Sequence, residues 1–127
     1  MNPLQKRWIQ ISAMMGFSAV TLGAFGAHGL KSHLSAYGLE IYHTGVLYHL
    51  IHAVVMLALS HGQLPGWKKA SVFFLWGILL FSGSLYILAI TEFKKLGMIT
   101  PFGGIFFLLG WGTLFSATLK IPAEKEV

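Results

Sequence analysis

Four long stretches of the sequence contain no aspartate, glutamate, lysine or arginine. They cover residues 8–30, 41–67, 70–91 and 96–119, and each is between 22 and 27 residues long. A helix needs about 20 predominantly apolar residues to cross the hydrocarbon core of a bilayer. A lipid-facing strand alternates apolar and polar residues, and these stretches do not. The sequence therefore predicts an all-α membrane protein, folded as an antiparallel bundle of four transmembrane helices.

The composition excludes several classes of protein. Only 10% of the 127 residues are charged, whereas a soluble domain carries about 25%. The net charge is +5, but the cations lie in short clusters between the apolar stretches and form no basic face for nucleic acid. We interpret them as anchors to lipid headgroups, so the expected partner is the bilayer. The absence of cysteine excludes disulfides and thiolate metal sites.

The chain reads as one domain, residues 1–127, and the markers between the stretches place the spans. Pro65-Gly66 is a turn signal, and Thr100-Pro101 predicts a helix start at which Thr100 is the N-cap. The expected spans cover about residues 8–28, 42–61, 70–90 and 99–119.

The cations also predict the orientation of the chain. Six of the nine lie at the two ends or in the second loop, and three lie in the first and third loops. Loops rich in lysine and arginine stay in the cytoplasm, which favours cytoplasmic termini. The six are Lys6, Arg7, Lys68, Lys69, Lys120 and Lys125, and the three are Lys31, Lys94 and Lys95.

Two segments have alternative interpretations. The basic start and apolar run at residues 6–27 are also found in signal peptides, but the uncharged stretch continues to Leu30, longer than such a core. Between residues 30 and 41, apolar residues recur at helical spacing, which is typical of a short amphipathic helix at the interface. Gly38 weakens that helix, and a plain loop is the alternative.

Small residues form a regular row in the first span and shorter rows in the third and fourth. Helices in lipid associate through close packing, and small residues let their backbones approach. The alternative is that glycine is simply common in membrane helices. We expect helix contacts at Gly16, Ala19, Gly23, Gly26, Gly77, Gly103 and Gly110.

The second span carries two histidines, His49 and His52, which are three residues apart and expected on one helix face. Ionisable side chains within a span are costly and often mark function. Three interpretations stay open: hydrogen bonds between helices, a polar path for transport, or a haem or metal site. Metal binding and proton coupling usually involve further ligands or carboxylates, and the spans hold no carboxylate. The candidate polar cluster is His28, His49, His52, Ser82, Ser84, Tyr86 and Thr100.

Motifs of enzymes are missing. No span holds paired carboxylates, no Gly-rich phosphate loop ends in Lys-Ser or Lys-Thr, and Gly83-Ser84 lacks the second glycine of a nucleophile elbow. We therefore expect no catalytic residue, no cofactor and no metal. The expected function is non-enzymatic, through helix packing with a second copy or another membrane protein.

Several blocks resemble a known family in the same order along the chain. They are GAFGAHGL at residues 23–30, HTGV with the following YH and HA at residues 43–53, FSGSLY at residues 81–86, and ITPFGG at residues 99–104 followed by Gly110-Trp111. They are similar to the YgdD/YwdK-like small membrane proteins, domain of unknown function 423, which are related to the transmembrane-protein-256-like proteins.

This resemblance covers nearly the whole chain and departs from the family in the variable first loop, residues 36–41. It implies four transmembrane helices in the bacterial inner membrane. It implies no established activity, so no catalytic residue carries over. The matching motif positions are His28, His49, His52, Ser82, Ser84, Tyr86, Thr100 and Pro101.

Overall fold

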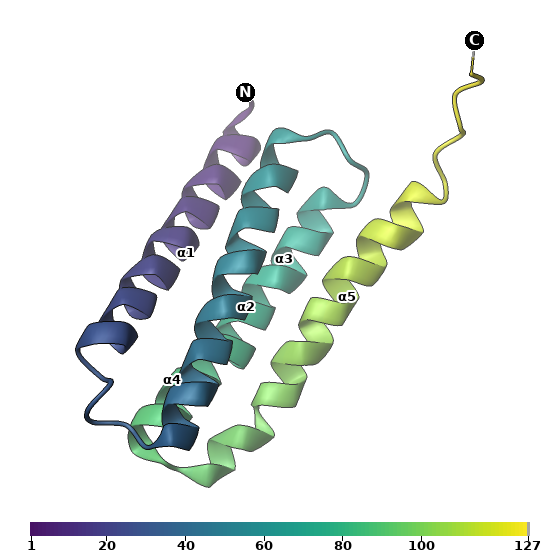
Figure 1. Cartoon of the computed structure of the whole chain (residues 1–127). Coiled ribbons are helices and arrows are strands. Elements are labelled where there is room, and N and C mark those ends of the chain that lie inside the picture. The colour runs from purple at the N-terminus through teal and green to yellow at the C-terminus, as the bar shows by residue number, and fades with distance from the viewer. Residues whose placement is uncertain (127) are drawn as a thin grey trace.

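Four antiparallel helical segments run side by side in the computed structural model, which describes residues 1–126 (Figure 1). The first two are α1 (Pro3–His28) and α2 (Ala36–His61). The third is continuous and consists of α3 (Trp67–Gly77), the π-helical segment η1 (Ile78–Ser82) and α4 (Gly83–Thr91). A 3₁₀ helix, η2 (Lys94–Met98), leads into α5 (Thr100–Thr118). No strand occurs within residues 1–126, and the predicted all-α bundle is confirmed.

All four segments are long and apolar enough to cross a membrane: Pro3–His28, Ala36–His61, Trp67–Thr91 and Lys94–Thr118. Each has 25 or 26 residues, which at 1.5 Å per residue gives a length of about 38 Å. The hydrocarbon core is about 30 Å thick, so the ends of each segment reach the headgroup region. This explains why α1 begins before Lys6 and Arg7.

Side-chain caps fix the starts of α1 and α2. The Asn2 side chain accepts a hydrogen bond from the Gln5 N–H at 2.8 Å, and the Gln5 side chain accepts one from the Asn2 N–H. At α2, the Ser35 hydroxyl accepts a hydrogen bond from the Gly38 N–H at 3.0 Å. Such caps satisfy backbone donors that have no partner within the helix.

The Ser35 cap settles the two interpretations of the first connection. Residues 29–35 form turns, in which the Leu30 carbonyl accepts hydrogen bonds from the N–H groups of His33 and Leu34. The apolar residues that follow Ser35 belong to α2 itself. The expected amphipathic helix over residues 30–41 is therefore absent as a separate element, and the plain loop is correct.

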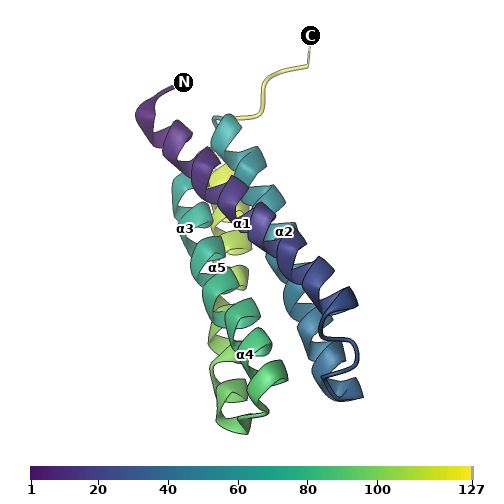
Figure 2. The same ribbon diagram turned by 90° about the vertical axis from the view of Figure 1, so that its left-hand side faces the viewer.

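The helices form two packed pairs, α1 with α2 and α3 with α5, and α2 connects the pairs. Helix α1 packs chiefly on α2, and α5 packs on α3 and η1, while α2 also contacts α3, η1 and α4. Figure 2 shows α1 crossing obliquely, so that its C-terminal half lies beside α2 and leaves α4 uncovered on that side. The bundle therefore has an open side between α1 and α4.

A cluster of buried apolar residues fills the half of the bundle nearer the termini. Its buried apolar residues come from α1, α2, α3, η1 and α5, and they are Trp8, Met56, Leu59, Ala70, Phe74, Ile78 and Phe107. The outward-facing residues are also apolar: Phe17 is 77% exposed and Leu108 is 72% exposed. An apolar outer surface is what lipid requires and what a soluble protein of this size avoids.

The π-helical segment η1 interrupts the third spanning segment near its middle. The Gly83 N–H bonds to the Ile78 carbonyl, five residues earlier, instead of the usual four. At the end of this turn the fully buried Ser82 hydroxyl donates a hydrogen bond to the Gly45 carbonyl of α2 at 2.6 Å. The π turn thus provides a polar link between the third segment and α2.

Candidate functional site

His49 lies between α1 and α4, and both of its ring nitrogens are hydrogen-bonded. Its Nδ1 is 2.9 Å from the Tyr86 hydroxyl, and its Nε2 is 3.2 Å from the Ser18 hydroxyl. The Ser18 hydroxyl donates to the Met15 carbonyl at 3.0 Å. Ser18 must therefore accept from Nε2–H, and Tyr86 donates to Nδ1. This network assigns the neutral Nε2–H tautomer to the 4% exposed imidazole.

His52 is satisfied by a separate set of partners. Its Nδ1 lies 2.7 Å from the Tyr48 carbonyl and therefore donates to it. Its Nε2 accepts a hydrogen bond from the Trp111 indole N–H of α5 at 3.2 Å. The imidazole stacks on Phe107 with a centroid separation of 3.8 Å and an interplanar angle of 11°. His52 is therefore also neutral and joins α2 to α5.

The two histidines do not form one site, contrary to the expectation from their spacing. His49 contacts α1 and α4, whereas His52 contacts α5. Residues three apart on a helix still differ by about 60° around its axis. Because helices pack on both sides of α2, each imidazole bonds to a different neighbouring helix.

Ser84 and Thr100 form a third polar contact, which joins α4 to α5. Their hydroxyl oxygens are 2.6 Å apart, and Ser84 donates to the Phe81 carbonyl at 2.9 Å. The Thr100 hydroxyl therefore donates to Ser84. The expectation that Thr100 caps α5 is wrong, because Ile99 is the N-cap and makes no side-chain cap. The Thr100 hydroxyl bonds to Ser84 instead of capping the helix.

His28 lies apart from the other candidates. It is the last residue of α1 and is exposed, and its side chain makes no hydrogen bond within residues 1–126. The sequence interpretation also missed three participants: Ser18, Trp111 and Tyr42, whose hydroxyl donates to the Leu22 carbonyl at 2.6 Å. Ser18 lies next to Ala19 of the small-residue row in the first span, and Trp111 follows Gly110, so both could have been noticed there.

Aromatic rings occupy the space above several of the candidate glycines. A Cβ added at Gly26 would overlap the Tyr42 ring, one at Gly77 would overlap Phe107, and one at Gly110 would overlap Phe74. The contact at Gly103 is of a different kind, because an added Cβ would meet the backbone of Phe81 instead of a ring. Gly45, which sequence reasoning did not include among the packing glycines, lies against the Tyr86 ring, 3.0 Å from the position of an added Cβ.

The first span shows a gradient in how closely its small residues pack. Ala19 is fully buried, and a Cβ at Gly23 would lie 3.2 Å from Val46. At Gly16, by contrast, an added Cβ would meet nothing within 4 Å. No contact within the chain requires glycine at that position, which departs from its expected role.

A small hollow opens on the side of the bundle that α1 leaves uncovered. Its volume is about 210 Å³, and it lies beside the hydrogen-bonded His49, Tyr86 and Ser18. Because their polar atoms are paired with one another, the remaining surface of the hollow is apolar. It is lined by Met15, Ser18, Leu22, His49, Ile78, Leu79, Gly83 and Tyr86.

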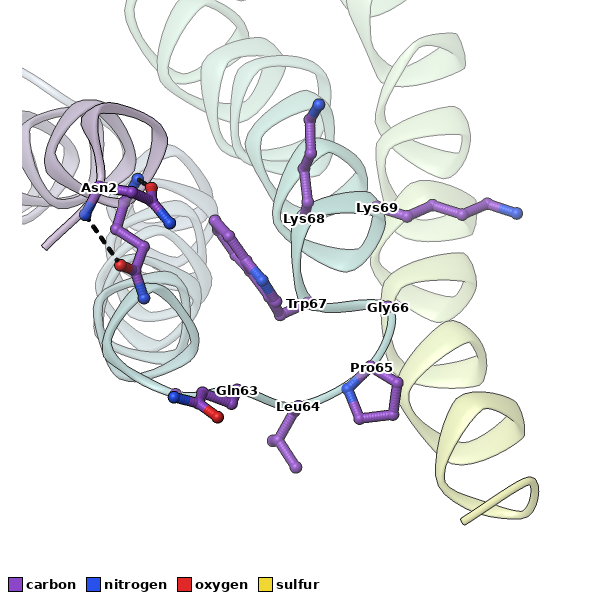
Figure 3. Close-up of a pocket in the computed structure, with 10 residues that line it drawn as sticks. Asn2, Gln63, Leu64, Pro65, Gly66, Trp67, Lys68 and Lys69 are labelled. Carbon is purple, nitrogen blue, oxygen red and sulfur yellow. Dashed lines mark hydrogen bonds between the residues drawn. The ribbon is translucent and has the colours of Figure 1, made fainter.

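A larger hollow of about 690 Å³ lies at the end of the bundle that carries both termini (Figure 3). The Asn2–Gln5 cap of α1 and the residues 62–69 around the second turn line it. In Figure 3 the Lys69 side chain extends away from Trp67 and toward α5. This hollow is polar at its rim, unlike the one beside His49.

Within residues 1–126, no three His, Cys, Asp or Glu side chains are grouped so that they could hold a metal ion. The ring nitrogens of His49 and His52 are already used in hydrogen bonds within the protein. Coordination of haem or metal by either imidazole would require one of these bonds to break.

Comparison with known proteins adds the family context. A family model described as "Protein of unknown function (DUF423)" matches residues 22–104. The UPF0382 membrane protein YwdK of Bacillus subtilis is 42% identical over 120 residues, which cover 91% of this chain and 98% of the relative. The UPF0382 inner membrane protein YgdD of Escherichia coli is 34% identical over 120 residues, 89% of each chain. No solved structure matches.

Proposed function

The chain belongs to the DUF423 family of membrane proteins, and we propose that it is a non-enzymatic protein of the inner membrane. We propose further that it works by lateral packing against another membrane helix. That helix comes from a second copy or from a partner protein. The name of the Escherichia coli relative supports the inner membrane as the location. The family carries no known reaction.

The observation that carries the proposal is the open side between α1 and α4. Helix α1 packs chiefly on α2, so the hollow beside Leu79 and Gly83 faces outward. An added Cβ at Gly83 would meet nothing within 4 Å, so the space there is free. A cavity of about 150 Å³ holds a benzene ring, and this hollow of about 210 Å³ has room for one large apolar side chain.

The physical driving force is close packing. Apolar exclusion does not bring helices together in lipid, whereas filling a hollow with a rigid side chain gains dispersion contacts that mobile acyl chains provide less well. The polar atoms of His49 and Tyr86 are already hydrogen-bonded within the chain, so they require no polar group from the docking helix. An apolar side chain of a second helix therefore fits the chemistry of the hollow.

Photo-crosslinking from the rim of the hollow tests this proposal. We expect Leu79→p-benzoylphenylalanine, introduced in cells, to give an adduct of one discrete mass, which for self-association is twice that of the chain. The variant Gly83→Leu fills the hollow from within and should abolish the adduct. The matched control is the same label at Leu108, which is also exposed but lies on α5. Equal adducts at both positions, or an adduct that survives Gly83→Leu, would contradict the proposal.

The alternative function is a small transporter or channel with a His/Ser/Tyr polar path. It has less support, because His49, His52 and the Ser84–Thr100 pair belong to three separate sets of hydrogen bonds. Reconstituted liposomes that contain a pH-sensitive dye discriminate between the two. Proton flux that disappears in His49→Phe would favour transport over packing.

The second alternative, haem or metal binding, has a direct test. The protein would be purified from cells supplied with haem and its absorbance spectrum recorded. A Soret band that His49→Phe or His52→Phe removes would favour this alternative, although each imidazole would have to give up a present partner.

The orientation of the chain is part of the same proposal. Both termini and the second turn lie at one end of the bundle (Figure 1). Six of the nine cations belong to these segments, including Lys68 and Lys69. We propose that this end faces the cytoplasm.

A further inference from the structure

We propose that a groove between the start of α3 and the end of α5 binds one anionic phospholipid, with the phosphate between Lys69 and Lys120. The groove adjoins the hollow of Figure 3 and shares Gly66 and Lys69 with it. It lies on a different side of the bundle from the hollow beside His49, so the two proposals are independent.

The two cations reach the groove from segments that are far apart in the sequence. Lys69 belongs to the first turn of α3, and Lys120 follows the end of α5. Figure 3 shows the Lys69 side chain directed toward α5, and its Nζ lies 5.9 Å from the centroid of the Phe73 ring. The groove has a volume of about 450 Å³ and is lined by Gly66, Lys69, Leu108, Leu109, Gly112, Thr113, Ser116, Ala117 and Lys120.

The floor of the groove suits a hydrocarbon chain. An added Cβ at Gly112 would meet nothing within 4 Å, so the α5 backbone is bare there. Leu108 and Leu109 continue the apolar surface toward the middle of the membrane. Nearer the lysines, the exposed Ser116 hydroxyl makes no hydrogen bond within residues 1–126 and can donate to a phosphate oxygen.

The length of the groove matches one leaflet of the bilayer. From Leu108 to its end at Thr118, α5 rises by roughly 15 Å at 1.5 Å per residue, and Lys120 follows just beyond. One leaflet contributes about 15 Å, which is half of the hydrocarbon core. A lipid whose phosphate lies at the lysines therefore has its acyl chain alongside Gly112 and Leu108.

Charge decides between a lipid and a second copy of the chain as the occupant. Within residues 1–126 no carboxylate lines the groove, and its rim carries Lys69 and Lys120. A second copy that docked here through the same face would bring these lysines toward their own counterparts, and like charges oppose such contacts. Basic pockets between membrane helices are typical sites for anionic headgroups.

Lipid binding to the purified full-length chain tests the role of the lysines. Dioleoyl-phosphatidylglycerol is titrated in detergent, and bound lipid is counted by native mass spectrometry. Each lysine near an anionic headgroup contributes about fivefold in affinity, so we expect Lys69→Gln with Lys120→Gln to weaken binding roughly 10- to 30-fold. The control removes the same charge at the same end, through Lys6→Gln with Lys125→Gln. Equal losses in both double variants would overturn the proposal.

A second pair of variants tests the acyl-chain part of the groove without a change in charge. Gly112→Leu places a side chain on the floor of the groove and should reduce retention of the lipid at least tenfold. Gly104→Leu is its control, because Gly104 is on the same helix, does not line the groove, and an added Cβ there would meet only the Phe81 side chain, at 4.0 Å. Unchanged retention in Gly112→Leu would overturn the proposal.

The source of the phosphate is settled by two further titrations. Dioleoyl-phosphatidylcholine, whose headgroup has no net charge, should bind at least tenfold more weakly than phosphatidylglycerol. Inorganic phosphate at the same concentration should not displace the bound lipid, because it lacks the acyl chain. Displacement by inorganic phosphate, or equal binding of the two lipids, would contradict a site for an anionic phospholipid.

Discussion

At the scale of single residues, the aromatic rings and glycines act as pairs. The Phe74 ring lies over Gly110 of α5, and the Phe107 ring lies over Gly77 of α3, so each of the two helices both gives and receives a ring. Tyr42 and Tyr86 lie over Gly26 and Gly45 in the same manner. Each pair brings two backbones close at a position where any side chain would overlap a ring.

Gly103 and Gly104 provide the sharpest test of close packing, because they are neighbours on α5. A Cβ at Gly103 would meet the backbone of Phe81, which cannot move aside as a flexible side chain could. We expect Gly103→Ala to lower the free energy of unfolding by about 1–3 kcal/mol. Gly104→Ala should be neutral or stabilise by up to about 1 kcal/mol, because alanine favours the helix and space is available there.

Unfolding in mixed micelles of mild detergent and SDS measures both effects. Equal changes in the two variants would show that α5 does not approach the Phe81 backbone of η1 closely at Gly103.

Tyr86 and His49 provide a test of the buried hydrogen bonds. Tyr86→Phe removes the donor to His49 Nδ1, and we expect a loss of about 0.6 to 1.7 kcal/mol in the free energy of unfolding. The control is Tyr37→Phe, whose hydroxyl is exposed and makes no hydrogen bond within residues 1–126. In a His49→Phe background the cost of Tyr86→Phe should shrink, which a double-mutant cycle measures. Strictly additive losses would argue against the contact.

Single residues also show where sequence reasoning succeeds and where it stops. Ser84 and Thr100 are polar residues in otherwise apolar spans, which makes both of them candidates, and their hydroxyls meet in the structure. His49 and His52 were grouped on spacing alone, and spacing cannot say which neighbouring helix each imidazole meets. That choice depends on the crossing angles of the helices, which no local pattern specifies.

At the scale of elements, the π turn in the third spanning segment determines which directions the side chains of α4 face. Ile78 packs in the interior at the start of the turn, and Ser82 donates to the Gly45 carbonyl at its end. The extra residue of a π turn shifts all later side chains around the helix axis. Tyr86 and Ser84 therefore owe their direction toward α2 and α5 to η1.

Deletion of Leu79 tests this role. Leu79 is half exposed, and its removal would convert the i→i+5 turn to a regular i→i+4 turn. Each kind of turn closes once around the helix axis, so α4 would keep nearly its present direction relative to α3. We therefore expect Ser84 and Tyr86 to keep their partners and the deletion variant to stay monodisperse on size-exclusion chromatography. Leu79→Ala keeps the residue count and should also behave almost like the parent chain. Aggregation of the deletion variant while Leu79→Ala stays intact would refute this account.

The elements themselves were largely predictable from the sequence. The uncharged stretches predicted four spans because no backbone amide can remain unpaired in lipid, so each stretch has to be helical. The π turn had no signal, because Ile78–Ser82 reads as an ordinary part of an apolar run. The first connection was ambiguous for another reason: helical spacing near Leu34 continues into α2, and only the Ser35 cap shows where the helix begins.

At the scale of the whole molecule, the uneven distribution of cations predicts how the chain lies in the membrane. Single cysteines at Lys31 and Lys68 would be labelled in intact cells with a reagent that cannot cross the bilayer. We expect Lys31→Cys to react and Lys68→Cys to react only after the membrane is opened, because the two lie at opposite ends of the bundle. The chain has no other cysteine, so each label reports on one position. Reaction of both from the same side would disprove the four-span topology.

The reciprocal fit of Phe74 with Gly110 and Phe107 with Gly77 has a mechanical consequence. Neither α3 nor α5 can turn about its long axis without driving a ring into the opposite backbone, so the two helices hold each other in one rotational setting. Helix α1 packs chiefly on α2 and has room on its α4 side. A small tilt of α1 toward α4 therefore meets no obstacle of the kind that prevents rotation of α3 against α5.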